Sequence, residues 1–173
     1  MITVIISTNR NNSYTSKVAR TYLELLKQKT EDCQLLDLAQ LPKDVAFSET
    51  YGQRSEAFAE TFEKTMSESD KFVFVMPEYN GGFPGILKLF IDAIPPKHLH
   101  GKKAGLIGCA SGHAGALRPM DQFTNVLNYL RVDVIADKPK LSKIEDAFSP
   151  SGDMVNQRYL DQLERHSERM VSF

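Results

Sequence analysis

The sequence has few cysteines, almost no net charge and no long apolar run. Cys33 and Cys109 lie far apart without a C-x-x-C pair, which argues against a disulfide framework or zinc knuckle and favours a reducing compartment. The formal net charge of −1 provides no polyanion-binding field, so we expect neither nucleic acid nor a membrane as partner, but a small molecule. The first apolar run stops at Ser7, too short for a signal or membrane span, and we expect a cytoplasmic protein.

Several motifs for nucleotides and catalysis are also absent. No G-x-G-x-x-G follows the first apolar run and no G-x-x-x-x-G-K-[ST] occurs, so neither a Rossmann site nor a triphosphate loop is supported. Ser111 is no nucleophile elbow, because Cys109 replaces the first glycine of G-x-S-x-G. Cys109 in turn lacks the arginine that a cysteine phosphatase of this topology would need, since that position is Gly115. The four histidines show no metal-ligand spacing, and we expect no metal.

What the sequence does have is a regular alternation of short apolar runs with segments of helical period. The runs are residues 2–6, 34–38, 72–76, 104–109 and, more weakly, 132–135. Apolar residues at helical spacing fall in residues 18–26, 58–66, 86–94, 120–130 and 160–170. Strands that are apolar on both faces and alternate with helices indicate a parallel sheet covered on both sides.

The predicted fold is one α/β domain, residues 1–173. Its 173 residues, 42% of them hydrophobic, suffice for one ordinary core. We predict a three-layer, doubly wound, five-stranded parallel sheet with the flavodoxin-like strand order 2-1-3-4-5. Two long connections, residues 40–54 and 137–155, remain. The first holds Phe47 and Tyr51, which either cover a site, meet a second subunit or pack over their own domain.

Three polar or glycine-rich loops follow strands of the predicted sheet, where such folds bind ligands. The first, residues 7–16, offers hydroxyls, asparagines and Arg10 at a helix N-terminus, a combination that suits a phosphate. An equal alternative is that Ser13 or Thr15 only caps the helix and that Arg10 is solvated. The second loop lies within residues 76–92 and the third is residues 111–115, where His113 either lines a pocket or has only a structural or exposed role. Together they suit a flat ligand with a phosphate tail.

The second loop closely resembles the P-E-Y-N-[GS]-x-x-P-G-x-L-K-x-x-I-D signature of the NADPH-dependent FMN reductase family. Residues 77–85 carry the match, together with Leu87, Lys88, Ile91 and Asp92. A plain strand-loop-helix corner with Pro84 at the first helical position explains only the glycines and prolines, and Lys88 with Asp92 is also consistent with a simple surface ion pair.

The other two loops are similar to further segments of that family. Thr8, Arg10 and Ser13 match its G-S-x-R-x-x-S-x-N phosphate loop, and Ser111, Gly112 and Gly115 match its S-x-G-x-x-G segment. The resemblance extends from residue 2 to about residue 130. The departures are Ser7 and Asn12 in place of common glycines, Thr15 in place of asparagine, and Gly82 in place of a frequent serine.

This resemblance implies an FMN-dependent oxidoreductase that uses NADPH or NADH. By a ping-pong route, hydride would pass to FMN and on to flavin, quinone, azo or metal-oxyanion acceptors. The flavin phosphate would lie on the first loop and the ring between the other two, whose backbone N–H groups would face its edges. No catalytic side chain is required. The implied cofactor-binding residues are Thr8, Arg10, Ser13, Tyr14, Thr15, Pro77, Glu78, Tyr79, Asn80, Gly81, Gly82, Ser111, Gly112, His113 and Gly115.

Other interpretations remain open. Glu78 is either a polar partner of the ring or a brace for its loop. An FMN-binding electron carrier is disfavoured by the small charge and by Arg10, whereas a regulatory protein is kept open by the missing glycines. The family also implies a homodimer or homotetramer, with Phe47, Tyr51 and Phe83 as plausible contacts.

Overall fold

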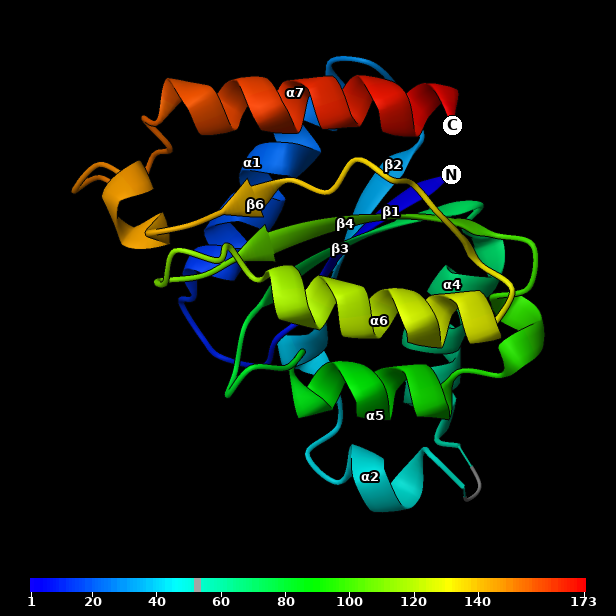
Figure 1. Cartoon of the computed structure of the whole chain (residues 1–173). Helices are drawn as coiled ribbons and strands as arrows, with labels where there is room; N and C mark the ends of the chain where they lie inside the picture. The colour runs from blue at the N-terminus through cyan, green and yellow to red at the C-terminus, as the bar shows by residue number, and fades with distance from the viewer. Residues whose placement is uncertain (52–53) are drawn as a thin grey trace.

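The computed structural model describes residues 1–51 and 54–173 and consists of a parallel sheet between two layers of helices (Figure 1). The strands are β1 (Ile2–Ile6), β2 (Cys33–Asp37), β3 (Lys71–Pro77), β4 (Lys103–Cys109), β5 (Asp133–Val134) and β6 (Lys140–Leu141). Their order is β2-β1-β3-β4-β5 with parallel neighbours, which confirms the predicted order. Strand β6 also pairs with β4. The sequence did not predict this strand, because two residues are too few to show a periodic pattern.

The helices cover both faces of this sheet. They are α1 (Tyr14–Lys27), α2 (Val45–Ser48), α3 (Glu56–Phe58), α4 (Lys64–Glu68), α5 (Gly85–Ala93), α6 (Leu117–Tyr129) and α7 (Gln157–Ser172). A π turn, η2 (Ala59–Glu63), joins α3 to α4, and the 3-10 turns are η1 (Leu38–Gln40), η3 (Pro96–His98) and η4 (Ile144–Ala147). Helices α1 and α7 lie on one face, and α4, α5 and α6 lie on the other (Figure 1).

The alternation of side chains along the strands divides the core into two halves. On β3, Phe72 and Phe74 belong to the half beneath α5 and α6, where Phe74 packs edge-on against Phe123 with ring centroids 4.9 Å apart. The intervening Val73 and Val75 belong to the half beneath α1 and α7. All four strand residues are fully buried, which confirms the prediction of strands that are apolar on both faces.

Local chemistry sets the ends of the two helices nearest the predicted site. Ser13 caps α1, because its Oγ accepts the Ser16 N–H at 3.1 Å. Pro84 has an extended ψ of 137° and is the N-cap of α5, so its expected place at the first helical position is wrong by one residue. Ile94, expected within the helix, is extended as well, as the residue before a proline tends to be.

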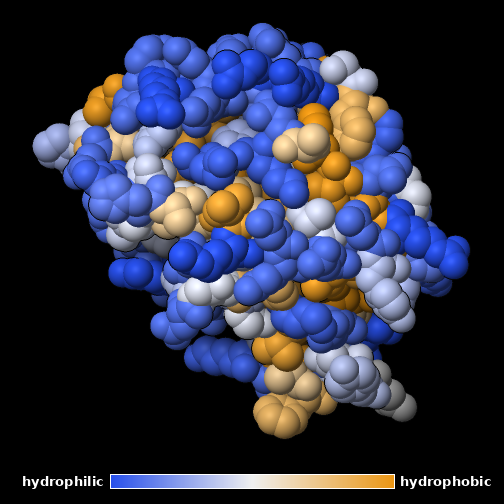
Figure 2. All heavy atoms as spheres, viewed as in Figure 1, coloured by the Kyte–Doolittle hydropathy of each residue, from blue (hydrophilic) through white to orange (hydrophobic). Residues whose placement is uncertain are grey.

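The two long connections contain short ordered elements. Helix α2 lies in the first, and β6 and η4 lie in the second. Phe47 and Tyr51 are 90% and 91% exposed, so the alternative that they pack over their own domain is wrong. Figure 2 shows orange, apolar atoms over α2 at the bottom of the view. The last residues of the first connection, apart from Arg54, lie outside the described residues. No described helix has the length and apolar character needed to cross a bilayer.

Candidate functional site

The structure brings the three predicted loops together at the carboxyl edge of the sheet. The register places Ile6 beside Val75 and Pro77 beside Cys109, so β1, β3 and β4 end side by side. One hollow of about 240 Å³ is lined from all three loops, by Arg10, Ser13, Tyr14, Thr15, Pro77, Glu78, Tyr79, Cys109, Ala110, Ser111, Ile144 and Glu145. A neighbouring hollow of about 530 Å³ is lined by Glu78, Asn80, Gly81, Ala110, Ser111, Gly112, His113, Ala114 and Arg118.

The two hollows share residues of the second and third loops and form one continuous site. Glu78, Ala110 and Ser111 line both. The narrower hollow reaches the N-terminus of α1, and the wider one opens beside the start of α6. The arrangement has the shape expected for a flat ligand whose anionic tail points at a helix N-terminus.

A hydrogen bond joins the first loop to the second. Thr8 Oγ1 lies 2.8 Å from the Tyr79 hydroxyl and accepts the Arg10 N–H at 3.2 Å. The Arg10 side chain is exposed, and no ion pair joins it to any of the described residues. It is therefore available to an anion in the hollow that it lines.

The two missing glycines of the first loop have structural explanations. Asn12 has φ of 52°, a left-handed conformation that asparagine adopts more readily than other residues with a side chain. Ser7 is fully buried, its N–H donates to the Val75 carbonyl at 2.9 Å, and its Oγ donates to the Ile5 carbonyl at 3.3 Å. The Ser7 side chain lines neither hollow, so it does not narrow the space beside α1.

The second loop is a tight hairpin turn. The Tyr79 N–H donates to the Gly82 carbonyl at 2.9 Å, and the Gly82 N–H donates to the Tyr79 carbonyl at 3.0 Å. Asn80 and Gly81 between them have φ of 51° and 79°, as a type I′ turn requires of an Asn-Gly pair. The turn therefore uses the Gly82 N–H internally, which leaves the Asn80 and Gly81 N–H groups as the donors of this loop toward the wider hollow.

An ion pair between residues far apart in the sequence fixes the second loop to α6. Arg118 donates to Glu78 Oε1 at 3.0 Å, and the side chains are 64% and 15% exposed. Gln122, one turn further along α6, donates to the Gly81 carbonyl at 3.4 Å. Glu78 thus braces its loop, one of the two alternatives considered for it, while still lining both hollows. Arg118 lies 40 residues away, so no short-range signal could have found it.

The third loop packs against the segment that follows β6. A Cβ at Gly115, whose φ is 57°, would lie 2.8 Å from Lys140 Cβ, so this glycine is required by the fold. Ser111 Oγ donates to Glu145 Oε1 at 2.5 Å, and Glu145 is a second lining residue that the sequence did not reveal. His113 is exposed and lines the wider hollow, as one alternative held.

The surroundings of Gly112 show whether a ligand could come close to the backbone at this site. A Cβ there would meet no atom within 4 Å, and its φ is outside the left-handed region. The protein's own packing therefore does not require glycine at this position, and the missing side chain leaves space toward the wider hollow that Gly112 lines. Close backbone approach to a flat ring is the physical use of such a glycine.

The remaining reactive groups do not suggest side-chain chemistry. Burial raises the pKa of the Cys109 thiol well above its ordinary value, so the thiol stays protonated and unreactive. No cluster of three potential metal ligands occurs among residues 1–51 and 54–173. Lys88 and Asp92 form the expected i, i+4 ion pair at 2.7 Å, and their side chains line a different hollow, between α5 and α6.

Comparison with known proteins agrees with this geometry. The family model described as NADPH-dependent FMN reductase matches residues 1–145. A quinone reductase of Escherichia coli (strain K12) is 28% identical over 171 residues, 94% of this chain and 88% of the relative. An FMN-dependent NADPH-azoreductase of Staphylococcus aureus (strain USA300) is 32% identical over 113 residues, 63% of this chain and 60% of the relative.

A solved structure supports the fold over the whole length. The flavoenzyme NAD(P)H:(acceptor) oxidoreductase FerB from Paracoccus denitrificans superposes with a TM-score of 0.81 at 21% identity, covering 99% of this chain and 94% of that one. The match of the family model to residues 1–145 confirms the predicted family. The chain belongs to the NADPH-dependent FMN reductase family, an oxidoreductase family named for the two cofactors that the sequence implied.

Proposed function

We propose that the chain binds FMN in the joined hollows and acts there as an NAD(P)H oxidoreductase on quinone, azo, flavin or metal-oxyanion acceptors. The observation that carries this proposal is that the first loop, which suits a phosphate, meets the second and third loops at one site. The third loop contains Gly112, a glycine that the protein's own packing does not require. Its relatives include a quinone reductase and an azoreductase. The two free cysteines support a reducing, cytoplasmic location.

The residues divide the work between the two ends of the site. Arg10 and the N-terminal N–H groups of α1 bind the phosphate. The Asn80 and Gly81 N–H groups bind one edge of the ring, and the backbone around Gly112 binds the other. FMN bound there would supply the redox chemistry, hydride transfer from the nicotinamide to the acceptor in a ping-pong sequence. The protein orients both reactants and provides hydrogen-bond donors where negative charge develops.

Steady-state oxidation of NADPH and NADH by FMN-loaded protein tests this function. We expect turnover with at least one quinone, azo dye or free flavin, and parallel lines in double-reciprocal plots for the ping-pong sequence. FMN binding without turnover on any acceptor would instead indicate an electron carrier or regulatory protein. Absence of FMN binding at micromolar concentrations would contradict both.

Arg10→Ala should weaken FMN binding by about 2 kcal/mol, or roughly thirtyfold, because a charge-assisted hydrogen bond to phosphate is lost. Flavin fluorescence quenching measures this, and riboflavin, which lacks the phosphate, provides the internal control. Its affinity should not change in the variant. Arg158→Ala, at the start of α7 and outside both hollows, is the matched control. An unchanged FMN affinity in Arg10→Ala would mean that the phosphate lies elsewhere.

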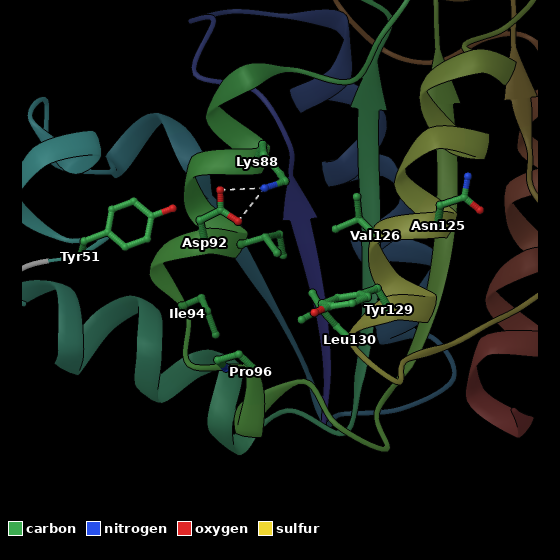
Figure 3. A pocket seen from close by; sticks show the side chains of 10 residues that line it. Tyr51, Lys88, Asp92, Ile94, Pro96, Asn125, Val126, Tyr129 and Leu130 are labelled. Atoms are coloured by element: carbon green, nitrogen blue, oxygen red, sulfur yellow. Dashed lines mark hydrogen bonds and ion pairs between the residues drawn. The ribbon is translucent and has the colours of Figure 1, made fainter.

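We also propose that the chain forms a homodimer through α5 and α6. Between these helices lies a mostly apolar hollow of about 520 Å³, lined by residues that include Tyr51, Ile94 and Tyr129 (Figure 3). Tyr129 is 87% exposed, unusual for a large ring. Phe83, in contrast, is half buried and packs on Phe123 with ring centroids 5.3 Å apart, so it is a weaker contact candidate than Tyr51.

Light scattering coupled to size-exclusion chromatography should give a dimer or tetramer for the wild type. Tyr129→Glu should shift the mass toward the monomer, because a carboxylate would be buried without a partner. Val155→Glu, a change at a residue that is 59% exposed and outside this hollow, should leave the mass unchanged. A wild type that is monomeric at micromolar concentration would contradict the proposal.

A further inference from the structure

A third hollow lies on the other side of the first loop, toward β2. It measures about 370 Å³, and its polar lining includes Arg10, Asn12, Ser16, Arg20, Asp37 and Gln40. The volume falls in the range of sites for small organic ligands, roughly 300 to 1,000 Å³. It shares only Arg10 with the narrower of the two proposed flavin hollows, so the two cavities are neighbours that meet at this residue.

The charges of this hollow are not neutralised by the protein itself. Arg20 is exposed and lies one turn after Ser16 on the same face of α1. Within the described part of the chain, neither Arg10 nor Arg20 forms an ion pair. Two guanidinium groups against the single Asp37 carboxylate leave a net positive charge, which favours a phosphate ligand.

Asp37 adds a second kind of specificity. It is the last residue of β2, and its Oδ1 accepts the Ala39 N–H at 2.9 Å, which holds the carboxylate at the N-terminus of η1. A carboxylate at the end of a strand in a doubly wound sheet is suited to accept hydrogen bonds from a ribose diol. The Asn12 and Gln40 amides can both donate and accept, as recognition of a base edge requires.

We propose that this hollow binds an adenosine 5′-phosphate group with a free ribose diol. The proposal rests on the proposed function, because two molecules of that chemistry bring such a group here. One is FAD, whose adenosine phosphate is joined directly to the flavin phosphate that Arg10 would bind. The other is the adenosine half of the dinucleotide donor. Asp37 disfavours a ribose 2′-phosphate, since two anionic groups would face each other.

AMP is the direct probe. Titrated into FMN-loaded protein, or into flavin-free protein if FMN does not bind, AMP should bind measurably by calorimetry or ligand-observed NMR. Arg20→Gln should weaken it roughly tenfold or more through loss of a charge-assisted bond. Asp37→Asn, which keeps an oxygen for the Ala39 N–H, should weaken AMP but not ribose-free inorganic phosphate. Arg165→Gln, an exposed change on α7 outside this hollow, is the matched control.

Two further measurements identify the source of the adenosine group. If it is FAD, wild-type protein binds FAD more tightly than FMN, and Arg20→Gln reduces that difference while leaving FMN affinity unchanged. If it is the donor, Arg20→Gln instead raises KM for NADH at constant kcat, and AMP competes with NADH. The proposal is overturned if AMP does not bind, or if Arg20→Gln and Asp37→Asn affect AMP no more than Arg165→Gln does. If the wild-type protein does not bind FMN at all, that result contradicts the proposed function and is distinct from a failure of the AMP test.

Discussion

Gly108→Ala is expected to lower the free energy of unfolding by about 3 kcal/mol, the upper end of the usual cost of overpacking. A Cβ at this position of β4 would overlap the Gly115 carbonyl oxygen and lie 2.9 Å from Met120 Cε. The methionine can move, but the backbone carbonyl cannot move without displacing the third loop. Alanine normally stabilises a strand relative to glycine by roughly 0.5 to 1 kcal/mol, so the sign of the effect tests the packing.

Denaturant unfolding and thermal melting measure this change. A loss of 3 kcal/mol corresponds to a fall in Tm of roughly 6 to 12 °C for a chain of this size. Gly85→Ala is the matched control, because a Cβ there meets nothing within 4 Å, and it should have equal or slightly higher stability. Weaker FMN binding is expected in Gly108→Ala beyond the stability loss, since the displaced loop lines the wider hollow. Stability equal to that of the wild type would contradict the packing argument.

The second large effect is a loss of stability on acidification that depends on His166. This histidine of α7 is fully buried, its Nδ1 lies 2.7 Å from the Tyr22 hydroxyl of α1, and a Cβ at Gly105 of β4 would lie 2.8 Å from its Nε2. Burial lowers the pKa of His166 to about 4; Asp137 raises it and Arg169 lowers it, both to a smaller extent. In the folded protein the His166 ring therefore stays neutral until the pH falls to about 4. In the unfolded chain the same ring takes up a proton near pH 6.5.

The sign follows from that difference. Above about pH 6.5 the histidine is neutral in both states, and its contribution is constant. Between pH 6.5 and 4 the unfolded state binds more protons, so the free energy of unfolding falls as the pH falls, by roughly 3 kcal/mol at most. Urea unfolding at several pH values measures the slope. His166→Gln should flatten it, although its stability at pH 7 is lower. His100→Gln, a change at an exposed residue, should keep the wild-type slope.

The sequence predicted the sheet well because its three central strands, β1, β3 and β4, are buried on both faces. Four strand positions and the strand order are confirmed, as are the helical segments that pack on them. The fifth strand is shorter than the predicted run, because only Asp133 and Val134 of that run form a strand beside β4. The π turn within residues 59–63 also escaped prediction, because Phe58, Phe62 and Met66 fit an ordinary helix equally well.

The site was predictable where one loop carried its own signal, and not where distant segments meet. Residues of all three loops line the joined hollows, and the Asn80-Gly81 turn follows directly from its residue types. Arg118 and Glu145 enter only through tertiary contacts, at sequence separations of 40 and 34 residues. The same holds for Asp37 and Arg20, which line one cavity only because α1 lies beside β2.

The two short strands that flank the outer side of β4 have a consequence for solubility. Its outer side is divided between β5, which pairs with Lys103 and Ala104, and β6, which pairs with Gly108 and Cys109. A seven-residue apolar strand left open would offer its unpaired backbone groups to the strands of other molecules. Two separate two-residue strands with a non-strand segment between them present too short and too interrupted a template for that pairing. The chain thus gains protection against aggregation at this side without a long, charged edge strand.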